Sequence, residues 1–155
     1  MFTRRSVLSL AAASLILTAC GDRSPDPEVA PVNLYNGETP QMRELIKKYA
    51  ELYDIPESLL HRLIQRESTY NAGARNGPYF GLMQIHPATA RGMGYSGPPE
   101  GLLDAETNLT YAGKYLKGAW MVSGGDESQA MMWYAKGYYY EAKRLGLLEE
   151  TGLQT

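Results

Sequence analysis

Apolar residues recur at intervals of three and four positions through most of the chain after residue 38, and no long segment alternates between apolar and polar residues. Helical spacing places apolar side chains on one face of a helix, whereas alternation would indicate a strand. The pattern therefore predicts a mainly α-helical single domain, with any sheet limited to a small ribbon between residues 71 and 80. A chain of 155 residues is long enough to bury one hydrophobic core.

Capping residues mark the expected helix starts. Thr39-Pro40 predicts the start of a first helix, and Asp54, followed by a proline and an acid, predicts the N-cap of a second. The first helix should bury a face made of Met42, Leu45, Ile46, Tyr49, Leu52 and Tyr53. The second should bury Leu59, Leu60, Leu63 and Ile64, and expose His61, Arg62, Gln65 and Arg66.

The remaining helices follow the same logic. A short helix is expected after His86, and Asp104 and Asp126 are the expected N-caps of two further helices. The last helix should cover residues 138–145 and stop at Gly146, because glycine is the preferred residue just beyond a helix end.

The N-terminal segment has a basic start followed by an apolar run, and residues 1–19 are interpreted as an export signal, by either the general or the twin-arginine route. The sequence Leu17-Thr18-Ala19-Cys20 resembles the lipobox of bacterial lipoproteins, at which the new N-terminal cysteine is acylated. Cys20 is the only cysteine and can form no internal disulfide. A lipid on Cys20 would attach the protein to a membrane surface.

Residues 20–38 contain three prolines and little apolar periodicity, so they are interpreted as a flexible tether, with the folded domain at 39–150. The whole chain has 15 Lys and Arg and 17 Asp and Glu. Loss of Arg4 and Arg5 with the signal would leave 13 basic residues against 17 acidic ones, a net charge of −4. A mildly acidic chain without a basic cluster argues against nucleic acid as a partner.

Glu67 closes the apolar face of the second helix, directly before a turn cluster at residues 75–78. A carboxyl group that follows an apolar stripe is partly withdrawn from water, which raises its pKa, as a general acid requires. The spacing also fits a frayed helix end at which Glu67 faces water or pairs with Arg66 or Arg75. Gln84, an amide within an apolar segment, must find partners in the backbone or in a ligand.

Five short segments acquire meaning from their order and spacing. They are Glu67-Ser68, Gly81-Leu82-Met83-Gln84, Pro87-Ala88-Thr89-Ala90, Asn108-Leu109 and Tyr115-Leu116. Over about residues 45–145 the chain thereby resembles the catalytic domain of the soluble lytic transglycosylases, which is related in fold to goose-type lysozyme. A motif gains weight from such context.

The resemblance implies cleavage of the bond between N-acetylmuramic acid and N-acetylglucosamine in peptidoglycan, with formation of a 1,6-anhydro end. It implies that Glu67 is the catalytic acid and base, that Gln84 binds the sugar or positions Glu67, and that Met83 lines the groove. Tyr115 would lie near the carboxyl group and Ser68 would brace the helix end, for which plain capping is an alternative. No cofactor is expected.

The sequence also departs from the family pattern. Where Ala-Tyr-Asn-Ala-Gly is common, residues 133–137 read Trp-Tyr-Ala-Lys-Gly, so Tyr134 matches as a substrate contact while Ala135 replaces the usual asparagine. Asn76, also a candidate substrate contact, occupies the place of a usual serine, and the loop before Gly81 is one residue shorter. Ala112 stands where glycine is usual.

Two alternatives stay open at this level: a lysozyme-like hydrolase, and a non-enzymatic lipoprotein that binds peptidoglycan. Metal catalysis is not expected, because His61 and His86 lack ligand spacing. A serine nucleophile is poorly supported, because the residues around Ser96 do not form a Gly-x-Ser-x-Gly elbow. The expected state is a monomer on the periplasmic face of the outer membrane, a location favoured by Gly21 after Cys20.

Overall fold

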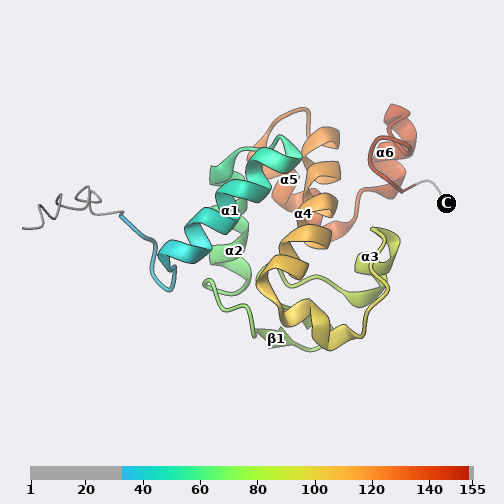
Figure 1. The fold of residues 1–155 in the computed structure, drawn as a ribbon. Coiled ribbons are helices and arrows are strands. Elements are labelled where there is room, and N and C mark those ends of the chain that lie inside the picture. Colours follow the sequence, from blue (N-terminus) through green and yellow to red (C-terminus); the bar gives the residue numbers. More distant parts are fainter. Residues whose placement is uncertain (1–32, 154–155) are drawn as a thin grey trace, which may run out of the picture. The chain divides into compact units, whose positions relative to one another are not determined.

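The computed structural model describes residues 33–153; the predicted signal peptide, Cys20 and most of the predicted tether lie outside this range. The described part is mainly helical, with one small sheet, which confirms the predicted fold class (Figure 1). Its elements in chain order are α1 (Pro40–Tyr53), α2 (Glu57–Glu67), β1 (Arg75–Asn76), β2 (Tyr79–Phe80), α3 (Pro87–Gly92), the 3-10 helix η1 (Pro99–Leu103), α4 (Ala105–Val122), α5 (Glu127–Lys136) and α6 (Tyr139–Leu145).

Helix α4 is the centre of the fold and contacts α1, α3, α5 and α6. Figure 1 shows α1 and α2 on one side of it and α3 and α6 on the other. Leu109 and Leu116 of α4 are fully buried. At Gly118 an added Cβ would lie 2.2 Å from the hydroxyl oxygen of Tyr138, which donates a 2.8 Å hydrogen bond to the backbone oxygen of Tyr115. The small residue in α4 therefore lets the start of α6 pack against it.

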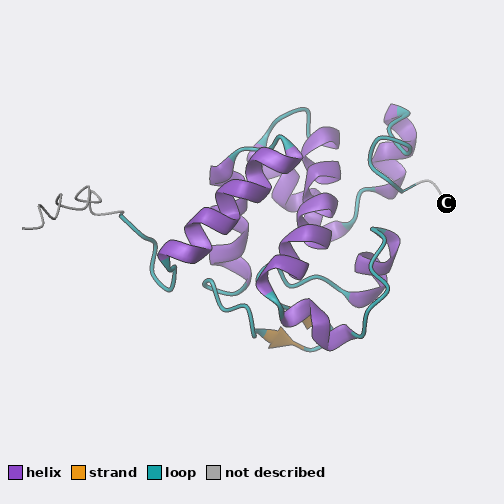
Figure 2. Cartoon of the chain, in the orientation of Figure 1, coloured by secondary structure: helices purple, strands orange, loops and turns teal. Residues whose placement is uncertain are grey.

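Three of the predicted helix starts are confirmed by their side-chain caps. The side chains of Thr39, Asp104 and Asp126 each accept a hydrogen bond from a backbone N–H in the first turn of α1, α4 and α5, respectively. Gly146 ends α6 in a left-handed conformation, with φ of 73°, as predicted. The predicted ribbon is the antiparallel pair β1 and β2, which Figure 2 shows as the only strands drawn among the described residues.

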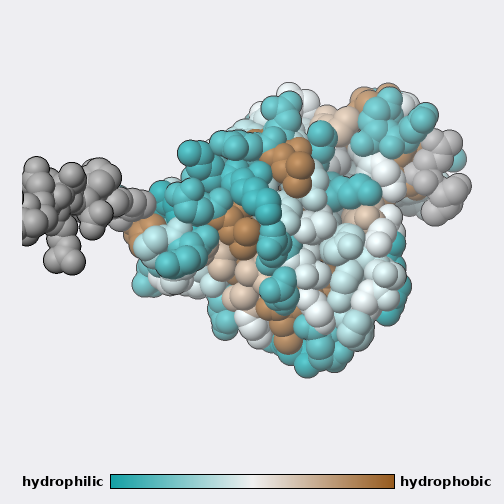
Figure 3. All heavy atoms as spheres, in the orientation of Figure 1, coloured by the Kyte–Doolittle hydropathy of each residue, from teal (hydrophilic) through white to brown (hydrophobic). Residues whose placement is uncertain are grey.

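Two predictions near the end of α1 are wrong. Asp54 is the left-handed C-cap of α1, with φ of 51°, and α2 instead starts after Pro56 without a side-chain cap. Leu52 is 61% exposed rather than part of the apolar face. It follows Tyr49 and Ala50, which do face the core, at a position rotated toward solvent. Figure 3 shows a small hydrophobic patch over the C-terminal end of α1.

His61 is a third correction, because it is only 4% exposed instead of facing solvent. Its Nδ1 lies 2.9 Å from the hydroxyl oxygen of Tyr70, and its Nε2 lies 3.2 Å from Oε1 of Glu57. Burial of an imidazole is tolerated when both ring nitrogens have partners. The solvent-exposed face of α2 therefore contains fewer residues than the sequence predicts, because His61 belongs to the buried face.

Residues 33–38, the end of the predicted tether, contact α1 and α2. The carboxylate of Glu38 is fully buried, and its two oxygens accept 2.6 Å hydrogen bonds from the Nε and Nη2 atoms of Arg43. The N–H of Tyr35 donates to the same carboxylate at 2.8 Å, and the Tyr35 ring lies 4.9 Å from the ring of His61. This short turn is therefore part of the folded unit.

Candidate active site

Helix α2 places Glu67 at the edge of the core. Leu59, Leu60, Leu63 and Ile64 of α2 are fully buried, as predicted, and the helix ends with Glu67 itself. Ser68 is the C-cap, and its N–H donates to the backbone oxygen of Ile64 at 3.0 Å. The next two residues, Thr69 and Tyr70, have φ of 51° and 62°, so the chain turns sharply away after the carboxylate. Ser68 thus acts as a plain helix cap.

The side chain of Glu67 is about a quarter exposed and pairs with Arg66. Both hydrogen bonds from the Arg66 guanidinium, at 2.9 Å and 2.6 Å, go to Oε1 of Glu67. Among residues 33–153 no hydrogen bond reaches Oε2, which leaves that oxygen available to a ligand. The sequence left open a carboxyl group partly withdrawn from water and one paired with Arg66 or Arg75; in the structure Glu67 is paired with Arg66, and about three quarters of its side chain is covered.

Glu67 opens into a cavity of about 220 Å³. The walls come from the end of α2, the β1–β2 hairpin, the loop before α3 and the end of α5. Its lining residues are Glu67, Asn76, Tyr79, Gln84, Tyr134 and Ala135. No other Asp or Glu is in this lining, so the structure surrounds one carboxylate with amide, phenol and apolar groups.

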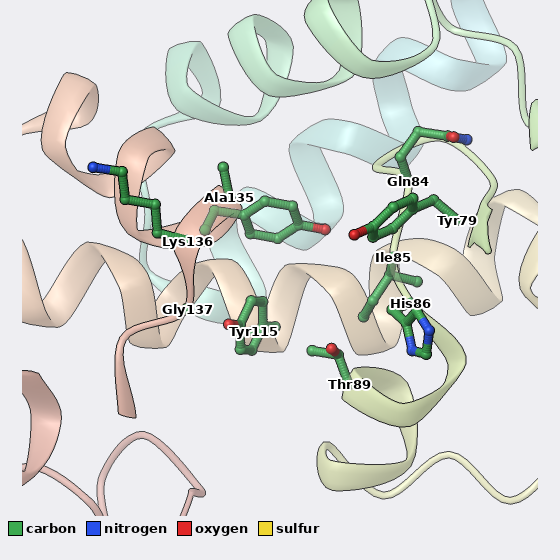
Figure 4. Close-up of a pocket in the computed structure, with 10 residues that line it drawn as sticks. Tyr79, Gln84, Ile85, His86, Thr89, Tyr115, Ala135, Lys136 and Gly137 are labelled. Carbon is green, nitrogen blue, oxygen red and sulfur yellow. The ribbon is translucent and has the colours of Figure 1, made fainter. Parts of the chain in front are cut away.

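A second cavity of about 310 Å³ continues the first and shares four of its lining residues, namely Tyr79, Gln84, Tyr134 and Ala135 (Figure 4). The further lining residues are Ile85, His86, Thr89, Tyr115, Lys136 and Gly137. We call the two cavities the acid compartment and the distal compartment. Together they form one groove, joined along the four residues that line both compartments.

Asn108 of α4 fixes the loop that forms the floor of the groove. Its buried Nδ2 donates to the backbone oxygens of Phe80 and Leu102, and its Oδ1 accepts from the N–H of Met83. Gly81 lies against this amide with φ of 78°, and an added Cβ would be 2.2 Å from Nδ2 of Asn108. The Gly81-Leu82-Met83-Gln84 segment is therefore locked to α4 by one side chain.

Gln84 mainly supports the loop. It has φ of 48°, and its Nε2 donates to the backbone oxygens of Ala74 and Gly81 at 3.1 Å and 2.8 Å. Figure 4 shows the amide turned away from Tyr115 and Thr89. Its Oε1 is buried and has no protein partner among the described residues. Within the Gln84 side chain, Oε1 is thus the atom left to accept a hydrogen bond from a ligand.

Tyr134 lines both compartments, and its hydroxyl group is bonded to the loop at Met83. The Tyr134 hydroxyl donates to the backbone oxygen of Met83 at 2.9 Å. Burial raises the pKa of Tyr134 well above its usual value, and the charge of Glu67 adds to the effect, so the hydroxyl stays protonated and keeps donating. The side chain of Met83 is fully buried in the core, so the expectation that it lines the groove is wrong.

Tyr115 lies in the distal compartment and does not line the cavity around Glu67, in contrast to the expectation. Its ring packs edge-on against Tyr134, with centroids 5.4 Å apart, and also contacts Tyr138. Burial raises the pKa of the Tyr115 hydroxyl. Its place is the far wall of the groove.

Polar contacts also hold the two helices that frame the acid compartment. Glu127, at the start of α5, accepts hydrogen bonds from Ser58 and Arg62 of α2. Those hydrogen bonds, Ser58 first and then Arg62, lower the pKa of Glu127 and keep it charged. Helix α2 ends at Glu67 and α5 ends at Lys136, and a residue at the end of each helix lines the cavity.

Sequence reasoning singled out Glu67, Asn76, Gln84 and Tyr134, and the structure brings all four together at the acid compartment. It missed Tyr79, Thr89 and Lys136 as groove residues. The turn cluster at residues 75–78 and the expected ribbon between residues 71 and 80 indicate a hairpin, but not which of its side chains faces the groove. Successive residues of a strand point to opposite faces, so a buried Phe80 would have indicated that Tyr79 points away from the core.

The described residues contain no group of three or more His, Cys, Asp or Glu side chains able to hold a metal ion. No helix in residues 33–153 has the length and apolar character needed to cross a bilayer.

The fold and the groove define a class: a helical, lysozyme-like domain with one acid at the end of a helix that packs one face into the core. A comparison with sequence models of known families matches the transglycosylase SLT domain over residues 44–147. The chain therefore belongs to the transglycosylase SLT domain family. Membership supports a function of the lytic transglycosylase type that acts on peptidoglycan.

Proposed function

We propose that this protein is a lytic murein transglycosylase that cleaves the β-1,4 bond between N-acetylmuramic acid and N-acetylglucosamine and leaves a 1,6-anhydro end. The observation that supports this proposal best is the single carboxylate of the groove, because neither compartment is lined by a second Asp or Glu. Glycosidases that use water normally need two carboxyl groups, about 5 to 9.5 Å apart. A mechanism in which a hydroxyl group of the substrate itself is the nucleophile needs only one carboxyl group.

In the proposed reaction the protonated carboxyl group of Glu67 gives its proton to the glycosidic oxygen as the bond from that oxygen to C1 of the muramic sugar breaks. The C6 hydroxyl of the same sugar then attacks C1, and the Glu67 carboxylate takes the hydroxyl proton. Glu67 is thereby returned to its protonated form, and no water is consumed. Oε2, which has no protein partner in the described residues, would make both transfers.

Other residues of the acid compartment would bind the sugar. Asn76 is exposed and offers an amide to the substrate, and the free Oε1 of Gln84 offers an acceptor. Tyr134 would act by holding the loop through Met83, since its hydroxyl is already committed. Ala135 contributes no polar atom, so the α5 side of this compartment is apolar at the position where the family commonly has an asparagine.

We also propose that the chain works in the cell envelope as a monomer, exported by residues 1–19 and attached through a lipid on Cys20 to the periplasmic face of the outer membrane. The support is the pattern of the sequence in that segment. Globomycin treatment, which blocks lipoprotein signal cleavage, should cause an unprocessed precursor to accumulate. A chain of unchanged size that remains soluble in both conditions would contradict the anchor.

The test of the activity is digestion of purified sacculi by the domain, with mass spectrometry of the soluble products. We expect muropeptides lighter by one water than hydrolysis products, with no heavy oxygen incorporated from labelled water. Glu67→Gln should abolish release, whereas Glu44→Gln, which changes an exposed acid of α1, should not. Reducing ends that carry the heavy oxygen would instead show a hydrolase. Binding to sacculi without soluble product from the wild type would show a non-enzymatic protein.

A further inference from the structure

Tyr79 is the exposed aromatic residue that lines both compartments of the groove. Its side chain is 45% exposed, although it borders the acid compartment on one side and the distal compartment on the other. Figure 4 shows its hydroxyl group directed into the cavity, toward the side where Ala135 lies. A large exposed aromatic side chain at the junction of two cavities is typical of a ligand contact.

The residues that share this junction with Tyr79 have no hydrogen-bonding side-chain donor left for a ligand. The hydroxyl group of Tyr134 donates to the backbone oxygen of Met83. Both N–H groups of the Gln84 amide donate to backbone oxygens, those of Ala74 and Gly81. Ala135 has no polar side-chain atom. Tyr79 makes no side-chain hydrogen bond within the described residues, so its hydroxyl is available at the point where the two compartments meet.

The hairpin holds the Tyr79 ring in place. Phe80, the next residue, is buried under the guanidinium group of Arg75, whose Cζ lies 4.4 Å from the ring centroid. Alternation along β2 therefore turns Tyr79 to the groove. The Tyr79 ring meets the ring of His86 edge-on, with centroids 5.9 Å apart, and Nδ1 of His86 is itself fixed by the N–H of Ala88.

We infer that Tyr79 is a substrate-binding residue whose ring supports an amino-sugar ring of the glycan where the strand passes from the acid compartment to the distal compartment. This inference rests on the proposed function and adds the contact that fixes the strand beside Glu67. The apolar face of a pyranose packs on an aromatic ring, while the phenol group reaches a sugar hydroxyl or acetamido group. The pairing of Asn76 with Tyr79 across the hairpin places a free amide next to the same sugar.

The test measures binding of purified sacculi by variants made in the Glu67→Gln background, so that turnover does not interfere. We expect Tyr79→Ala to weaken binding about tenfold, equivalent to about 1.4 kcal/mol, and Tyr79→Phe to keep most of the affinity because the ring remains. Tyr140→Ala, which removes a tyrosine that is 84% exposed on α6, is the matched control and should bind normally. Circular dichroism should show the same helical fold in all variants.

The inference is overturned if Tyr79→Ala binds as well as Tyr140→Ala, or if Tyr79→Phe loses as much affinity as Tyr79→Ala. In the active background Tyr79→Ala should raise KM more than it lowers kcat, because the contact is made to the bound glycan; an effect on kcat alone would also overturn it. The proposed function fails separately, if the wild type releases no anhydro product while the Tyr79 variants still differ in binding.

Discussion

The hydroxyl group of Tyr134 on α5 donates a 2.9 Å hydrogen bond to the backbone oxygen of Met83, in the loop that precedes α3. The bond joins two segments that are 51 residues apart and that both contribute residues to the groove, Tyr134 and Ala135 from α5 and Gln84 from the loop. It gives the hydroxyl group of this buried tyrosine, which lines the same cavity as Glu67, a partner in the protein itself.

Tyr134→Phe should therefore lower the free energy of unfolding by about 1 to 3 kcal/mol, since the buried oxygen of Met83 loses its partner. Release of muropeptides should fall as well, because the loop that includes Gln84 is less firmly held. Urea denaturation and sacculus digestion measure the two effects. Tyr140→Phe, on the solvent-exposed side of α6, is the control and should leave both unchanged. A Tyr134→Phe protein with wild-type stability would show that the bond contributes nothing.

Gly81→Ala should destabilise the protein by about 3 kcal/mol or more, because overpacking and a left-handed backbone both oppose the new methyl group. The Cβ would collide with Nδ2 of Asn108 and with the backbone oxygen of Leu102. The matched substitution Gly92→Ala places its methyl group where no atom lies within 4 Å, so it should be tolerated. Thermal unfolding of both variants checks the prediction, which equal melting temperatures would refute.

The Glu38 carboxyl group predicts an acid-sensitive contribution to stability. Burial opposes its ionisation, but the hydrogen bonds from Arg43 and from the N–H of Tyr35 outweigh burial and hold the pKa below the ordinary value of 4.5. A pKa that is lower in the folded than in the unfolded state stabilises the fold above the unfolded value, and this stabilisation is lost as the pH falls through the folded value.

Glu38→Gln should accordingly cost about 2 kcal/mol at neutral pH, in line with hydrogen bonds to a charged group. The difference from wild type should shrink as the pH falls below 4.5. Urea titrations at a series of pH values measure it. Glu44→Gln serves as the exposed control on α1. A difference that is independent of pH would show that the charge of Glu38 is not involved.

Ala135→Asn should increase the rate of anhydro product formation about fivefold, the effect of one added hydrogen bond of about 1 kcal/mol. The amide would enter the acid compartment from α5. Ala135→Leu, which adds a side chain of similar size without polar atoms, is the control and should slow the reaction by filling the cavity. The rate of sacculus digestion at steady state, measured for both variants, checks the prediction. An Ala135→Asn variant as slow as Ala135→Leu would contradict a role for the amide.

Most of the fold follows from local patterns in the sequence. The caps at Thr39, Asp104 and Asp126 act on backbone groups only three residues away, so a single sequence contains the whole interaction. The helical spacing likewise identifies Leu63 and Ile64 as buried without any tertiary information. Asp54 was misassigned because a capping residue followed by proline does not distinguish the end of one helix from the start of the next.

The site was harder to predict because its contacts join distant parts of the chain. The sequence predicts Gln84 and Met83 as groove residues, but the direction of each side chain depends on the left-handed backbone at Gln84 and on the bond that the N–H of Met83 donates to Oδ1 of Asn108. The same holds for Tyr79, which faces the groove only because Phe80 turns into the core. The spacing of residues offered both Arg66 and Arg75 as partners of Glu67, and only the structure shows that the partner is Arg66.

The Asn108 clamp has a practical consequence for anyone who redesigns this groove. One amide satisfies backbone groups of Phe80, Met83 and Leu102, so Gly81 and Asn108 behave as a single unit that must be kept together. At the hairpin tip, residues 76–79, an added Cβ at Gly77 meets no atom within 4 Å, so the constraint there is the left-handed backbone of Gly77, with φ of 56°, and not a lack of space. A library that varies the tip and preserves the clamp would sample new glycan preferences on an intact scaffold.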